Sequence, residues 1–148
     1  MTQPKRSQKA ETEKLVELLQ EWQALEDHGI RWLCQTRAQT RNPLLRQVLS
    51  IIMHDSTQHR RVQAILLEGL TKKAFSLTPE EVAEVWEQLA EHDKTERASI
   101  EKAKEARKAT THPIVRYFLS YLLADEEKHH RMLENLEDIK RDLYPYGW

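Results

Sequence analysis

The chain has 148 residues, and its composition already excludes several classes of protein. With only 3 Gly and 5 Pro, it lacks the turn residues that an all-β fold needs. Its 23 basic and 24 acidic residues give a net charge of -1, so no overall positive field favours nucleic acid. The single cysteine, Cys34, excludes a disulfide framework and a Cys-x-x-Cys metal site. We therefore predict one helical domain that does not bind nucleic acid.

Hydropathy sets the expected compartment. No apolar run approaches the roughly 20 residues that a membrane span requires. The first ten residues are polar and lack the apolar core of a signal peptide. We therefore expect a cytoplasmic protein without a membrane partner.

Helical periodicity and helix-start motifs divide the chain. Residues 1–11 show no apolar periodicity and are predicted to form a disordered tail. Asn42-Pro43 and Thr78-Pro79-Glu80-Glu81 have the form of helix N-termini, the second with a capping box. The pattern predicts helices at 12–39, 43–69, 79–109 and 113–141, followed by an aromatic tail at 142–148. Four long helices with short connections favour an all-α, antiparallel four-helix bundle over residues 12–141.

The chain is also similar to itself at an offset of 70 residues. Residues 15–70 align without a gap to residues 85–140, and 15 of the 56 pairs are identical. Composition alone would give roughly four identities. The matches include Glu26/Glu96, Pro43/Pro113 and His59/His129. The alignment indicates two duplicated helical hairpins.

Polar residues interrupt the apolar face of each predicted helix at matching positions. Glu26 and Glu96 lie on the first and third helical faces, and His59 and His129 lie on the second and fourth. Each glutamate precedes its histidine by 33 residues, a spacing that places the two side by side in an antiparallel hairpin. Burying such groups without compensation is unfavourable by several kcal/mol, and a metal ion compensates their charge. The pattern therefore predicts a buried metal site.

The second half carries a recognisable motif. Glu96 followed by Glu126-Glu127-Lys128-His129 resembles the Glu … Glu-x-x-His half of the ferritin-like carboxylate bundles, which include ferritins, bacterioferritins and rubrerythrins. The resemblance extends over residues 12–140 and implies a ferritin-like bundle that binds iron or manganese. The ligand set that it implies is Glu26, His59, Glu96, Glu126 and His129.

The same resemblance implies a function. Members of the family use iron for oxidase- or peroxidase-type chemistry, or handle iron itself. This chain has no rubredoxin-type cysteines, so a redox enzyme of this kind needs an external electron donor. A homo-oligomer is a further expected partner, because the aromatic tail at 142–148 is suited to folding back on the bundle or onto a second copy.

The first half departs from the family pattern at Ser56, which stands where the motif has glutamate. Asp55, or a water held by Ser56, is a substitute ligand; otherwise the site holds one metal instead of two, or is degenerate. Asp125 matches a family aspartate that orients a histidine. His92 and His130 are additional ligand candidates, and His130 replaces His129 if the helix is slightly rotated.

Two alternatives remain open at this stage. A metal-free helical bundle that serves as an interaction scaffold also accounts for the polar layer, through register specificity. The connection at residues 70–77 spans at most about 28 Å, so it fits a simple up-down-up-down bundle and crosses a full bundle length only if helix ends unwind.

Overall fold

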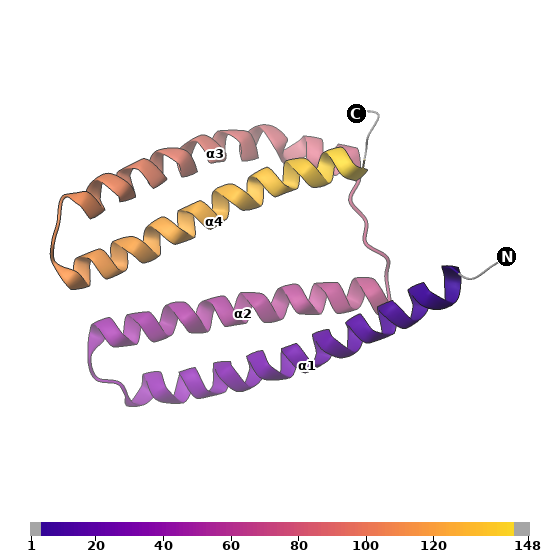
Figure 1. Ribbon diagram of the computed structural model, residues 1–148, viewed down its shortest axis with the longest axis horizontal. Coiled ribbons are helices and arrows are strands. Elements are labelled where there is room, and N and C mark those ends of the chain that lie inside the picture. The colour runs from indigo at the N-terminus through magenta and orange to yellow at the C-terminus, as the bar shows by residue number, and fades with distance from the viewer. Residues whose placement is uncertain (1–3, 144–148) are drawn as a thin grey trace. The chain divides into compact units, whose positions relative to one another are not determined.

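The computed structural model describes residues 4–143 and contains four long helices (Figure 1). They are α1 (Pro4–Gln39), α2 (Pro43–Thr71), α3 (Pro79–Lys108) and α4 (Pro113–Leu143). The described range contains no strand. The prediction of an all-α fold with four helices is confirmed.

The helices form two antiparallel pairs. α1 packs against α2 and α3 packs against α4, as Figure 1 shows. The chain divides at residue 76 into two compact units that correspond to these pairs. We call residues 4–71 the first hairpin and residues 79–143 the second hairpin, and we describe each by itself. Packing of the two hairpins into a ferritin-like bundle stays a prediction.

Local capping explains where the central helices begin. The Asn42 side chain accepts hydrogen bonds from the backbone N–H of Leu44 at 2.9 Å and of Leu45 at 3.2 Å, with Pro43 in the first turn. Thr78 and Glu81 form the reciprocal capping box that the sequence predicts, with contacts of 2.8 and 3.2 Å. Each motif provides acceptors for N–H groups that the first helical turn leaves unpaired.

The predicted helix bounds agree with the structure within two residues at every end but one. The largest difference is at the N-terminus, where α1 begins at Pro4, whereas the sequence predicts a tail up to residue 11. Apolar periodicity reports burial, and residues 8–11 are exposed and therefore carry no such signal. Their composition of Gln, Lys, Ala and Glu nevertheless has high helix propensity. The predicted aromatic tail lies outside the described residues from residue 144 onward.

Each hairpin buries few side chains. The buried apolar residues are Leu19 and Leu33 in the first hairpin and Val82, Ile100 and Leu123 in the second. Others on the apolar faces, such as Trp22 and Met132, are exposed, because a helix pair covers only one side of each helix. Two polar side chains, Gln63 and Glu96, are buried among the apolar ones.

Candidate metal centre

The two hairpins repeat one contact between their helices. In the first, His59 Nδ1 lies 3.3 Å from Glu26 Oε1, and in the second, His129 Nδ1 lies 3.5 Å from Glu96 Oε1. Both glutamates are much less exposed than their histidines. These contacts join residues that are 33 positions apart, as the spacing predicts. Equivalent residues of the duplicated halves therefore occupy equivalent places in their own hairpins.

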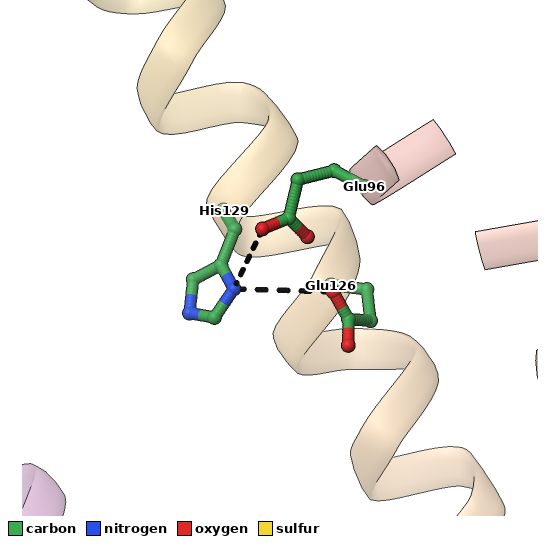
Figure 2. Close-up of side chains that lie close together, drawn as sticks. All are labelled: Glu96, Glu126 and His129. Carbon is green, nitrogen blue, oxygen red and sulfur yellow. Dashed lines mark ion pairs between the residues drawn. The ribbon is translucent and has the colours of Figure 1, made fainter. Parts of the chain in front are cut away.

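Only the second hairpin adds a third ligand-type group. Glu126 lies one helical turn before His129 on α4, and its Oε2 is 4.0 Å from His129 Nδ1. Glu96, Glu126 and His129 each offer one ligand atom, and these atoms all lie within 4.8 Å of one another. Figure 2 shows the three side chains converging, with Glu96 from α3 facing Glu126 and His129 from α4. Within residues 4–143, no other group of three such residues is found.

Glu96 is the most deeply placed member of this group. Its side chain is 5% exposed, and its Oε2 has no hydrogen-bond partner when Glu126 is ionised. A buried carboxylate oxygen without a donor is destabilising by about 1–3 kcal/mol or more. A cation or a proton shared with Glu126 removes this penalty.

The two carboxylates shift each other's pKa in opposite directions. The hydrogen bond with Glu126 lowers the pKa of Glu96, and the nearby His129 and His92 lower it further against the effect of burial. The same hydrogen bond, together with burial and the charge of Glu96, raises the pKa of Glu126. Glu126 therefore carries the proton that the pair shares.

The first hairpin has the pair but not the third group. Ser56 occupies the turn before His59 on α2 and is half-buried, as is the neighbouring Asp55. Of the described carboxylates, Glu26 is the one within ion-pair distance of His59. The substitution of Asp55 for the missing glutamate therefore finds no support in the contacts of His59.

The other predicted residues also have defined positions. Asp125 Oδ2 lies 3.8 Å from His129 Nε2, the ring nitrogen opposite the Glu96 contact, and Asp125 also pairs with Lys128. This places Asp125 on the correct side to orient His129, although 3.8 Å is too long for a hydrogen bond.

His130 lies outside the group of Glu96, Glu126 and His129. Its Nδ1 lies 2.5 Å from Asp93 Oδ1 and its Nε2 lies 3.3 Å from Glu134 Oε1. Asp93 also pairs with Arg97, and the hydrogen bond from His130 lowers the pKa of Asp93. His130 thus belongs to a separate polar cluster beside the centre.

Two further polar side chains lie in or near the helix contacts of the hairpins. His92, one helical turn before Glu96, has its Nε2 2.6 Å from Glu96 Oε1, as residues four apart on a helix allow. Its role as a ligand stays a prediction. Gln63 was not singled out, yet it is 3% exposed and neither side-chain polar atom has a partner among the described residues. The duplication contains a signal for Gln63, since its counterpart at the 70-residue offset is the apolar Leu133.

Comparison with known proteins provides no family assignment: no family model matches the chain, and no curated protein or solved structure is significantly similar to it. None of the described helices combines the length and the apolar character that crossing a membrane demands.

Proposed function

We propose that the protein binds iron or manganese through Glu96, Glu126 and His129 of the second hairpin. The observation that carries this proposal is the buried Glu96 carboxylate, which faces a second carboxylate and an imidazole and has one oxygen without a donor when Glu126 is ionised. Two adjacent carboxylates repel each other when both are ionised. A divalent cation between them replaces that repulsion with attraction and satisfies the orphaned oxygen.

The donor chemistry supports the choice of metal. Two carboxylates and one imidazole are ligands that suit iron and manganese, whereas the thiolates that select copper(I) or iron–sulfur clusters are absent from the group. When bound, iron supplies one-electron chemistry with dioxygen or peroxide. The role of the chain is to hold the ion, to orient His129 through Asp125, and to exchange a proton at Glu126.

The type of reaction that we propose follows from the resemblance to the ferritin-like family. An oxidase-, peroxidase- or iron-handling role of the ferritin-like type is consistent with this donor set, and an external reductant would supply the electrons. Glu26 and His59 stay predicted as additional ligands, so a second ion depends on them. The second hairpin offers three ligand groups by itself, and we therefore expect the first tightly bound ion there.

Metal analysis tests the proposal. Full-length protein, stripped with a chelator and reloaded with ferrous iron under argon or with Mn²⁺, should retain about one ion per chain after desalting. His129→Ala and Glu96→Gln should lose it, and His130→Ala, which removes the neighbouring imidazole in a different cluster, should retain it. If wild-type protein retains no metal above the His129→Ala variant, the proposal is wrong and the metal-free scaffold becomes the better explanation.

A further inference from the structure

We infer that His92 is a fourth protein ligand, so that the second hairpin holds one metal ion with two imidazoles and two carboxylates. This inference rests on the proposed function and extends it to a residue that is not part of the ferritin-like motif. The ligand set would be His92 and Glu96 from α3, with Glu126 and His129 from α4.

The first argument is the convergence of two imidazoles on one oxygen. His92 Nε2 lies 2.6 Å from Glu96 Oε1, and His129 Nδ1 approaches that same oxygen at 3.5 Å from the opposite helix. Two ligand atoms bound to one ion at about 2.1 Å lie about 3.0–3.4 Å apart. The His129 contact is already near this spacing. The His92 contact has the length of a hydrogen bond, and His92 lies outside the group whose ligand atoms are all within 4.8 Å of one another. Coordination by His92 therefore requires rotation of its side chain, which is 59% exposed.

The second argument is the arrangement of the four residues on their helices. His92 and Glu96 are four residues apart on α3, and Glu126 and His129 are three apart on α4. Both separations place two side chains on one helical face. Each helix therefore presents two ligand groups, and the antiparallel pairing brings the two sets together.

The third argument is the buried oxygen. When Glu126 is ionised, Glu96 Oε2 has no hydrogen-bond donor, although the side chain is 95% removed from solvent. An ordinary exposed ion pair between residues four apart on a helix does not require a buried, unpartnered oxygen beside it. The first hairpin provides an internal comparison, because Trp22 stands at the position equivalent to His92, and Ser56 at that of Glu126. The hairpin that has the additional histidine is also the one that has the complete glutamate motif.

The decisive experiment uses the full chain with Co²⁺ for affinity and Cu²⁺ for counting imidazoles. Co²⁺ titration of His92→Ala should give an affinity at least about tenfold below that of wild type. The control is His112→Ala, which removes an exposed histidine near the start of α4 in the same hairpin and should bind as wild type does. Alanine favours helix, and His92 is exposed, so the variant should retain wild-type helicity by circular dichroism.

Pulsed electron paramagnetic resonance of the Cu²⁺-loaded proteins separates a ligand from a residue that only positions Glu96. Two coordinated imidazoles are expected in wild type, and one in His92→Ala. If His92→Ala retains two imidazoles, or binds Co²⁺ as the His112→Ala control does, the inference is overturned while the proposed function stands. If wild type binds neither Co²⁺ nor Cu²⁺, the proposed function is wrong, and the inference that rests on it is wrong as well.

Discussion

At the scale of single residues, the second hairpin places two carboxylates where one proton is shared between them. Glu126 has the raised pKa and Glu96 the lowered one, so the stable metal-free state has a protonated Glu126 that donates to buried Glu96. As the pH rises through the raised pKa of Glu126, this proton is lost and the two charges repel each other. The features that favour a cation therefore destabilise the protein in its absence.

Replacing Glu126 with glutamine should separate stability from binding. The amide of Glu126→Gln donates a hydrogen bond to Glu96 without a charge, so we expect the metal-free variant to gain about 1 kcal/mol at a pH above the raised pKa of Glu126. The same change removes one anionic ligand and should weaken Co²⁺ binding at least about tenfold. Urea unfolding and Co²⁺ titration measure the two effects. A variant that is both less stable and still a tight binder would refute the shared-proton arrangement.

Gln63 presents the opposite situation, a buried polar side chain without a charge or a partner among the described residues. The duplicated position is Leu133, so an apolar side chain is compatible with this place in the hairpin. Gln63→Leu should therefore stabilise the protein by about 1–3 kcal/mol, because it removes the cost of burying an unpaired amide. Gln58→Leu, an exposed change on the same helix, should be close to neutral. Chemical denaturation of both variants checks the prediction, and a destabilised Gln63→Leu would mean that the amide has a partner in solution.

At the scale of helices and hairpins, the sequence is informative where local chemistry decides the structure. Asn42-Pro43 and Thr78-Pro79 mark the starts of α2 and α3 because capping depends on a few adjacent residues. The 33-residue spacing predicts the Glu26–His59 and Glu96–His129 contacts because a short turn fixes the register of an antiparallel pair.

Other features depend on side-chain direction, which spacing alone does not fix. The approach of His92 to Glu96 requires a particular rotamer of an exposed side chain. The pairing of His130 with Asp93 and Glu134 depends on the rotation of α4 against α3. The beginning of α1 at Pro4 depends on helix propensity in an exposed segment, where apolar periodicity gives no information.

The difference between the hairpins can be tested by restoring the missing glutamate. Ser56→Glu would give the first hairpin the same three groups as the second, because Ser56 precedes His59 by one turn and Glu26 already contacts that histidine. We expect the number of Co²⁺ ions bound per chain to rise by about one, with weaker affinity at the new site because Trp22 stands where the second hairpin has His92. Ser56→Gln matches the size without the charge and should bind as wild type does. If Ser56→Glu binds no more Co²⁺ than wild type, then Glu26, His59 and the introduced glutamate are not sufficient to form a metal site in the first hairpin.

At the scale of the whole molecule, metal binding should be coupled to thermal stability. An ion that binds only the folded protein raises its melting temperature, by about 5–10 °C at a concentration about 100-fold above Kd. Acid should reduce this effect, because protons compete with the metal for Glu126. The pKa of Glu126 is raised on folding, so its protonation stabilises the metal-free protein below the ordinary value of 4.5, and this contribution is lost as the pH rises through the raised pKa.

The Mn²⁺-induced shift in melting temperature should therefore grow from pH 5 to pH 7.5. Differential scanning calorimetry with and without Mn²⁺ at both pH values measures this dependence. The lowered pKa of Asp93 affects stability below pH 5, so it changes the melting temperature with and without Mn²⁺ in the same way. In Glu126→Gln, the metal-induced shift should be small and should depend little on pH. A shift in wild type that is equal at both pH values would show that Glu126 gives up no proton when metal binds.

The division of the described chain into two locally closed hairpins has a consequence for how the molecule opens. All four residues assigned to the metal lie between positions 92 and 129, within the second hairpin. A segment whose contacts are local can open and close as its own cooperative unit, and a bound ligand protects the unit that holds it. We therefore expect Mn²⁺ to slow amide hydrogen exchange throughout residues 79–143 and to leave residues 4–71 nearly unchanged. Equal protection of both segments would instead mean that the two halves of the chain exchange as one unit, joined by cooperative unfolding as well as by a peptide linker.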